Sequence, residues 1–243
     1  MLKELQITEM SWILGGKSGA GAALLESEQC LCWQPEDNET LRSFSARPYL
    51  NSLKGYLDPA GHFVMAACSL LKKANHLLAG NNDPTAGIGI AALSYFGAAN
   101  SASAFFGQLL QKGPRLASPL IFPHSYASTA ANLAAIEFGW GGPHMIFYGK
   151  QDCRESLEFA AARLAEDSAQ RMLVIAYEAI SPELLPNKRF VRNGALALLV
   201  EKACDCPARL RFELARLRAL PVSFSGAGSV QDSLHLLVGL QHR

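Results

Sequence analysis

Hydrophobic positions along the chain follow two periods, one typical of strands and one typical of helices. Runs that are apolar at nearly every position, such as 87–96 and 171–180, predict strands buried on both faces. Segment 208–217 instead alternates apolar and charged residues, which predicts a half-exposed strand. In order along the chain, the predicted strands are residues 2–10, 28–34, 87–96, 144–149, 171–180, 193–203 and 208–217.

Segments with apolar residues at helical spacing lie between many of these strands. The best-marked helix begins after Asp58, a candidate N-cap, and has Pro59 at its first position. The predicted helices are residues 58–78, 101–113, 125–140, 153–170 and 229–240. Strands and helices therefore interleave, which predicts an α/β fold with one sheet covered by helices on both faces. We find no internal repeat or long linker, so we expect a single domain over residues 1–243.

Composition adds a hint of a partner and excludes some functions. Only 18% of the 243 residues are charged, against about 25% in a typical soluble domain, and 49% are hydrophobic. The deficit predicts unusually extensive burial, in a large core or against another protein. The net charge of +1 gives no electrostatic case for nucleic acid or an anionic membrane. We find no apolar run of membrane-spanning length and no signal-peptide pattern, so we expect a cytoplasmic protein that does not insert into a membrane.

Cysteine and histidine spacing does not predict a metal or cofactor site. Two cysteine pairs, Cys30 with Cys32 and Cys204 with Cys206, have C-x-C spacing, unlike the C-x-x-C of zinc ribbons. We expect these cysteines to be packing residues, and disulfides are not expected in the cytosol. The six histidines are scattered singly along the chain. The GGKSG segment at 15–19 lacks the preceding glycine that a phosphate-binding loop requires.

A longer pattern in the middle of the chain resembles a known family. The segment ASPLIFPHSYASTAANLAAIEFGWGGPHMIFYG, residues 117–149, is followed by an alanine-rich helix and then by MLVIAYEAI. In order and spacing this resembles the N-terminal half of a β-ketoacyl synthase, and the likeness extends over about residues 3–202. The resemblance implies a thiolase-like, layered α/β/α fold corresponding to one half of a ketosynthase. Segment 203–243 is a predicted strand and helix of unclear origin.

The catalytic residues of that family are not where the resemblance would put them. In active ketosynthases the nucleophilic cysteine follows the proline of the GP turn by eight residues, and eight residues after Pro143 stands Gln151. An amide is not a nucleophile, and glutamine at this place resembles the chain length factors, the non-catalytic partners of ketosynthases. The family's two catalytic histidines also lack counterparts, because 223–240 resembles only a shortened version of one of their motifs, with His235 displaced into the helix.

The resemblance therefore implies a non-catalytic subunit that pairs with a catalytic β-ketoacyl synthase. The implied interface is the strand formed by Met145, Ile146, Phe147 and Tyr148, with the neighbouring helices. The residues implied to shape the partner's acyl tunnel are Phe105, Phe106, Met145 and Phe147. Ordinary core packing is the alternative for these four. A truncated subunit of this kind resembles those of aryl polyene systems, in which the chain grows on an acyl carrier protein and the subunit would meet the carrier only indirectly.

Two other classes of function stay open. One is an acyltransferase or thioesterase-like enzyme in which Cys153 is the nucleophile, with His124 or His144 as its base. The other is a homo-oligomeric scaffold for carrier proteins. The basic segment 187–192 could meet an acidic carrier, and a solvated loop is the alternative for it.

Overall fold

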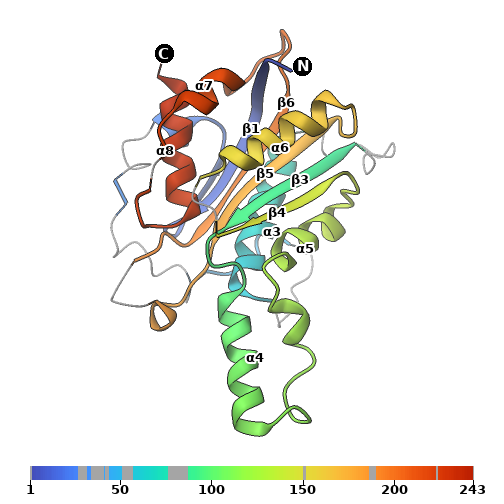
Figure 1. The fold of residues 1–243 in the computed structure, drawn as a ribbon, viewed down its shortest axis with the longest axis vertical. Coiled ribbons are helices and arrows are strands. Elements are labelled where there is room, and N and C mark those ends of the chain that lie inside the picture. Colours follow the sequence, from blue (N-terminus) through green and yellow to red (C-terminus); the bar gives the residue numbers. More distant parts are fainter. Residues whose placement is uncertain are drawn as a thin grey trace.

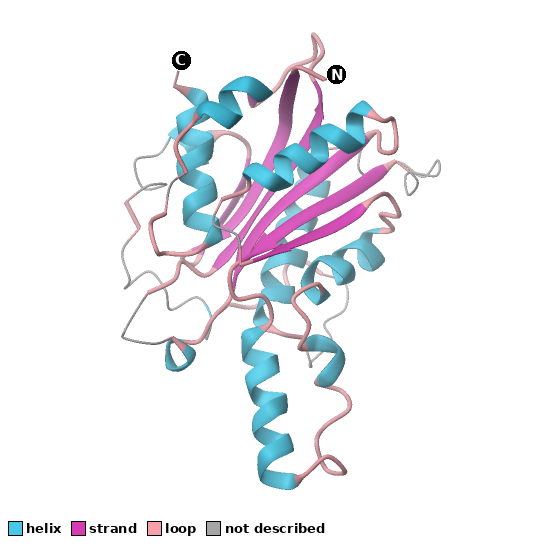
Figure 2. Ribbon diagram, viewed as in Figure 1, coloured by secondary structure: helices cyan, strands magenta, loops and turns pink. Residues whose placement is uncertain are grey.

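The structure is a computed structural model of the chain, and it describes residues 2–26, 32–33, 41, 44–50, 57–75, 87–149, 152–185, 190–222 and 224–242. Over these residues the fold is one mixed sheet with helices on both faces (Figures 1 and 2). The predicted layered α/β class is confirmed. Most of the predicted strand 28–34 lies outside the described residues.

The sheet has the strand order β2-β1-β6-β5-β3-β4, and β7 pairs with β1. Strands β3 and β4 are parallel to each other, as are β3 and β5, whereas the remaining pairs are antiparallel. The bounds are β1 Glu4–Leu14, β2 Lys17–Ala20, β3 Ile88–Ser94, β4 His144–Tyr148, β5 Arg171–Glu178, β6 Gly194–Lys202 and β7 Leu210–Glu213. The GGKSG segment supplies the turn between β1 and β2, where Gly15 and Gly16 both have positive φ.

The five predicted helices are present in the predicted order, with ends that differ by up to five residues, and α1 and α7 are additional. Their bounds are α1 Ala23–Glu26, α3 Pro59–Ala74, α4 Ala99–Lys112, α5 Thr129–Phe138, α6 Arg154–Ala165, α7 Leu214–Ala219 and α8 Ser229–Gln241, with short 3-10 turns η4 Phe122–His124 and η5 Pro182–Leu184. Asp58 is the predicted N-cap, because its Oδ1 accepts from Ala60 N at 2.9 Å. Its Oδ2 accepts from Ser101 N at 2.9 Å, so the same carboxylate ties α3 to α4.

Each face of the sheet carries its own hydrophobic core. Helices α6, α7 and α8 cover one face, and α3 and α5 cover the other (Figure 1). Strand β6 feeds both cores by alternation: Leu196, Leu198 and Val200 face the α6 side, while Ala195 and its neighbours at period two face the α3 side. Among the described residues, no helix is both long and apolar enough to cross a membrane.

The predicted strand 208–217 is wrong over its second half. Strand β7 ends at Glu213, and helix α7 begins at Leu214. Leu214 and Leu217 are both buried in the core on the α6 side, at the spacing of one helical turn. Tertiary burial of this pair therefore overrides the alternation that predicted a longer strand. Together with α8, these elements cover one face of the sheet.

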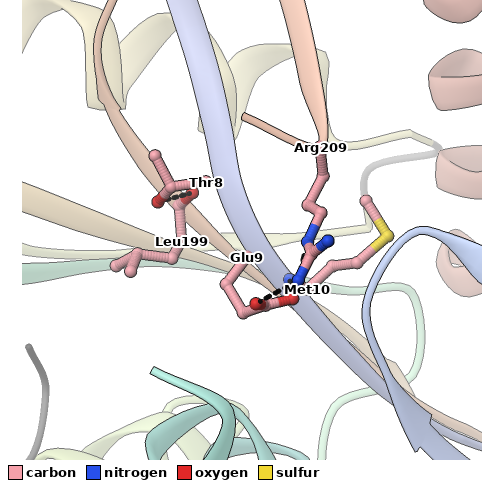
Figure 3. Close-up of polar contacts among 5 residues, drawn as sticks. All are labelled: Thr8, Glu9, Met10, Leu199 and Arg209. Atoms are coloured by element: carbon pink, nitrogen blue, oxygen red, sulfur yellow. Dashed lines mark hydrogen bonds and ion pairs between the residues drawn. The ribbon is translucent and has the colours of Figure 1, made fainter. Parts of the chain in front are cut away.

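A bulge in β1 marks the place where this strand changes neighbours. On one side, Glu4–Ile7 pair with β7 and Ser11–Leu14 pair with β2. Between the two stretches, Thr8 is an extra residue in the ladder with β6, and its hydroxyl reaches Leu199 O at 3.4 Å. The Glu9 carboxylate accepts from Met10 N and pairs with Arg209 Nη2 at 3.0 Å (Figure 3). This ion pair fastens the C-terminal segment to β1.

Candidate functional site

Strand β4 forms one edge of the sheet and is the predicted interface strand. Within the described residues it pairs only with β3 (Figure 2). Its side chains are unusually apolar for an edge: Met145 is 42% and Tyr148 61% exposed. Its one titratable group near neutrality is His144, and burial lowers the pKa of this imidazole below its usual value. The edge is therefore uncharged at pH 7.

The other end of the sheet is protected in the usual way. Strand β2 has only four residues, begins with Lys17 and is mostly exposed. Short length and a lysine are devices that prevent edge-to-edge association. Strand β4 has neither lysine nor proline, so the two edges differ in whether they discourage pairing with another chain.

A projecting arm continues the apolar surface beyond β4. Helix α4 and the segment after it extend away from the sheet (Figure 1). Its exposed large apolar side chains are Phe106, Leu110, Leu116, Leu120, Phe122 and Tyr126. The rings of Phe105 and Tyr126 lie 5.2 and 5.3 Å from that of Phe122, so helix and return segment are joined by aromatic contacts. An exposed apolar surface of this extent marks an interaction site.

The base of the arm meets the end of β4 at Gly97. This residue has φ +58°, and a Cβ there would lie 2.8 Å from Ala127 Cβ and 3.0 Å from Tyr148 Cε2. Glycine therefore lets the Tyr148 ring and the end of the return segment approach the same turn. The exposed Tyr148 at the end of β4 and the return segment of the arm are consequently neighbours.

The four predicted tunnel residues occupy two parts of this structure. Phe105 and Phe106 lie on the arm, where Phe106 is 59% exposed and cannot be a core residue. Phe147 packs on the core of the α6 side, with its ring 6.3 Å from that of Phe159. Core packing therefore accounts for part of the Phe147 contact, and Ile146 packs against the opposite core.

Gln151 and Lys150 lie outside the described residues, between β4 and α6. Gly149 ends β4 with φ +70° and donates its N–H to Ser94 O at 3.0 Å. On the far side, Asp152 Oδ1 accepts from Arg154 N at 3.0 Å at the start of α6. The strand and the helix predicted on either side of position 151 are therefore present.

Cys153 is a core residue. It is fully buried in the cluster beneath α6. Burial raises the pKa of its thiol to about 12, and the neighbouring Asp152 adds to the rise. A thiol of this kind is almost entirely protonated at pH 7 and is a poor nucleophile.

Neither candidate base lies where it could deprotonate Cys153. His144 begins β4, whereas Cys153 follows its far end, and a strand of five residues spans roughly 13 to 17 Å. His124 lies in η4, which packs against α4 and α5, and α5 covers the face of the sheet opposite to the core that holds Cys153. The geometry therefore disfavours the enzyme in which Cys153 is the nucleophile.

The sequence analysis missed a buried carboxylate, Glu178. Its oxygens accept from Tyr95 N at 2.6 Å, Phe96 N at 3.2 Å, and the Ser229 hydroxyl and N–H at 2.6 and 3.1 Å. Ser94 Oγ donates as well, at 3.2 Å. Burial raises the pKa of Glu178, and these hydrogen bonds oppose the rise. The one signal in the sequence was a lone acidic residue in the apolar run MLVIAYEAI.

An apolar cavity of about 250 Å³ lies beside Glu178. Its lining residues are Tyr95, Phe96, Leu185, Val191, Phe224, Gly226 and Gly228. A Cβ at Gly228 would lie 3.0 Å from Glu178 Cγ, so Glu178 lies directly behind the cavity wall. The carboxylate itself does not line the cavity. In the part of the chain that is described, no three His, Cys, Asp or Glu side chains cluster closely enough to hold a metal ion.

The sheet order, the two helical layers and the loop before α6 define a thiolase-like fold of the ketosynthase type, and solved structures bear this out. A chain of the ishigamide ketosynthase/chain length factor superposes with a TM-score of 0.64 at 17% identity over 84% of the present chain. A chain of AntDE:AntF, a type II polyketide synthase acyl-carrier protein in complex with its ketosynthase, gives 0.66 at 19% over 83%. The ketosynthase ApeO in complex with its chain length factor ApeC from Xenorhabdus doucetiae gives 0.57 at 15% over 83%.

These likenesses establish the fold. The fraction of each solved chain that the match covers differs between them. The match covers 64% of each of the first two chains and 80% of the third. The present chain thus spans less than two thirds of the length of the first two. No protein-family model and no curated protein matches the sequence.

Proposed function

We propose that this protein is a non-catalytic, chain length factor-type subunit that pairs with a catalytic β-ketoacyl synthase. The observation that carries the proposal is the uncharged edge of β4, joined at Gly97 to the exposed apolar arm. The likeness to ketosynthases solved with a chain length factor supports it. Two observations support a non-catalytic role. Glutamine stands in place of the nucleophile, and Cys153 is buried and protonated.

The proposed interface consists of β4, the exposed face of α5 and the arm. Obligate interfaces commonly bury about 2,000 Å² or more and resemble a core cut in half. An apolar edge strand with an adjoining arm meets that description better than any charged face of the chain would. The partner's acyl carrier protein meets this subunit indirectly, through the ketosynthase.

The test is co-purification with a co-expressed catalytic β-ketoacyl synthase. We expect a stable one-to-one complex on size exclusion, which Met145→Lys and Tyr148→Lys disrupt, because each puts a charge on the edge. The matched control is Leu184→Lys in η5, a residue of similar exposure on another element. Thermal melting of each variant alone checks that the fold is kept. A monomer that ignores the ketosynthase would contradict the proposal.

The same complex tests whether this chain is non-catalytic. We expect Gln151→Ala and Cys153→Ala to retain elongation by the partner, because neither side chain takes part in the chemistry. Loss of turnover in Cys153→Ala with the complex intact would make the loop a displaced active site. Self-association without any ketosynthase would favour the homo-oligomeric scaffold.

We further propose that Phe105, Phe106, Met145 and Phe147 line the acyl tunnel of the partner. Exposure of Phe106 on the arm supports this role, since a partner must cover the ring. We expect Phe106→Ala to lengthen or broaden the products of the complex, as measured by mass spectrometry of the released chains. Unchanged products from an intact complex would remove the arm from the tunnel.

The biosynthetic pathway is the most specific part of the proposal. The resemblance points to an aryl polyene system, in which an aryl-primed chain is extended on a carrier protein. Elongation assays of the complex with aryl-primed and acetyl-primed carrier protein separate the two cases. Preference for the acetyl primer would reject the aryl assignment and leave the subunit role standing.

A further inference from the structure

The loop between β6 and β7 carries two exposed thiols that are separated by one residue. Cys204 and Cys206 are both exposed, with Asp205 between them. The buried cysteines Cys68 and Cys153 belong instead to the two cores. The expectation that the Cys204 and Cys206 pair would be packing residues is therefore wrong, because the loop leaves the sheet after Lys202 and packs neither side chain.

The first of these thiols is held by a buried side chain. Gln6 of β1 is fully buried, and its Nε2 donates to Cys204 Sγ at 3.1 Å. Its Oε1 accepts from Cys204 N at 3.2 Å, so the amide brackets the cysteine from both sides. Arg211 of β7 donates to the same Oε1 and to the carbonyl oxygen of Cys204.

The sheet register determines this placement. On β1, Gln6 lies opposite Glu201 of β6 on one side and Arg211 of β7 on the other. The loop that joins β6 to β7 must therefore pass across the end of β1 at this residue. A buried amide needs hydrogen-bond partners, and here the sulfur and backbone of Cys204 supply them.

The two thiols have different proton affinities. The pKa of Cys204 is lowered, first by hydrogen bonds that its sulfur accepts from the thiol and the backbone N–H of Cys206, and then by the Gln6 amide. The pKa of Cys206 is raised, because its thiol donates to Cys204. Cys204 therefore reaches the nucleophilic thiolate form before Cys206, and the second thiol stands two residues further along the same exposed loop.

We propose that Cys204 and Cys206 form a thiol–disulfide exchange site that reacts with low-molecular-weight disulfides such as glutathione disulfide. The Cys204 thiolate attacks one sulfur of the disulfide, forms a mixed disulfide and expels one thiolate. The Cys206 thiol loses its proton to water and attacks Cys204 Sγ, which expels the second thiolate. The two cysteines are oxidised, the small disulfide is reduced, and the two protons end on the released thiols.

The short spacing makes the product a reversible disulfide. Two residues separated by one can bring their Cα atoms within the roughly 6.8 Å that a disulfide tolerates. A ring closed over a single residue in an exposed loop belongs to the labile, readily reduced kind. This property of the chain is independent of any ketosynthase partner.

The test is to incubate the reduced full-length protein with glutathione disulfide and follow it by intact mass and peptide mapping. We expect loss of two hydrogens, located to the peptide that contains 204 and 206. Cys206→Ser should stop at a glutathione adduct on Cys204, whereas Cys204→Ser should form no disulfide in this peptide. Gln6→Leu should slow the reaction about tenfold, because the thiolate loses a donor. The exposed Cys32 is the internal control.

Three results would overturn the proposal. They are a Cys204 that reacts no faster than Cys32, a Cys206→Ser variant whose stable adduct forms elsewhere, and a wild-type protein that remains a glutathione adduct without closing the ring. Far-ultraviolet circular dichroism of Gln6→Leu checks that β1 is intact. Should that variant misfold, the rate ratio of Cys204 to Cys32 in the wild type decides the question alone.

Discussion

Glu178, at the end of β5, joins two distant segments of the chain through one carboxylate. It receives backbone N–H groups from the loop after β3 and from the start of α8, at Tyr95, Phe96 and Ser229. Glutamine at this place has one accepting oxygen and an NH₂ group. In either orientation of the amide, the NH₂ group confronts at least one of these fixed N–H donors.

We therefore expect Glu178→Gln to lower the free energy of unfolding by about 1–3 kcal/mol, the cost of leaving buried donors without an acceptor. Urea unfolding followed by circular dichroism measures the difference. The matched control is Glu137→Gln on the exposed face of α5, where we expect a change within about 0.5 kcal/mol. Equal stability of the two variants would show that the buried carboxylate is dispensable.

The same residue predicts a pH dependence with a definite sign. Burial raises the pKa of Glu178 above its ordinary value of 4.5, so the folded chain keeps this proton at pH values where the unfolded chain has lost it. Stability from this group is therefore complete below the ordinary pKa and falls as pH rises above it. The advantage of the wild type over Glu178→Gln should shrink as pH rises above 4.5, as measured by urea unfolding. An advantage that grows over this range would contradict the sign.

At the scale of single elements, the entry into β4 depends on a close approach between backbones. A Cβ at Gly142 would lie 2.5 Å from Ile88 O and 2.7 Å from Gly89 N, both main-chain atoms of or next to β3. Gly142 N donates to Ile88 O at 2.9 Å, and Ile90 N donates to Pro143 O at 2.8 Å. The glycine and proline of the GP turn thus join β4 to β3.

We expect Gly142→Ala to destabilise the protein by about 1–3 kcal/mol, because the backbone of β3 must shift to admit the methyl group. The proposed complex should weaken with it, since β4 is its edge. The matched control is Gly107→Ala on α4, where a Cβ meets nothing within 4 Å. Helix propensity there predicts a gain of roughly 0.5–1 kcal/mol. Thermal melting shows whether the two substitutions have opposite signs, and equal signs would refute the close-approach argument.

At the scale of the whole molecule, the C-terminal segment completes one of the two cores. Strand β7 and helices α7 and α8 cover the sheet on the α6 side, and Leu234 of α8 is fully buried there. The part of the chain that resembles a ketosynthase, residues 3–202, lacks this cover. We expect a chain ending at Lys202 to aggregate or to bind a hydrophobic dye, because that core would face water. A cooperatively folding 1–202 fragment would contradict this.

Two single leucine-to-alanine substitutions distinguish an effect on folding from an effect on association. Leu234→Ala should cost about 2–5 kcal/mol of stability, as truncation of a buried leucine does. Leu110→Ala on the arm removes the same atoms from a side chain that is 70% exposed, so stability should change by less than about 0.5 kcal/mol. The proposed complex should weaken in the Leu110 variant. Chemical unfolding and size exclusion of both variants check the contrast.

Much of the fold was predictable because its information is local. Apolar runs at 87–96 and 171–180 became buried strands, and Asp58 with Pro59 began a helix, since periodicity and capping depend on residues close together in the chain. The strand predicted at 193–203 is also confirmed as β6, and its two sides lie in different cores. The resemblance to a ketosynthase half anticipated the fold that the solved structures share.

What the sequence by itself determined about this protein is therefore the order of its elements, the layered class and the apolar character of β4. Only the tertiary structure decided that β4 is an edge, that Leu214 starts a helix and that Cys153 is buried while Cys204 is exposed. The donors around Glu178 come from segments separated by more than a hundred residues. The physical reason is that burial, edges and hydrogen-bond partners belong to contacts between distant segments, whereas periodicity belongs to neighbours.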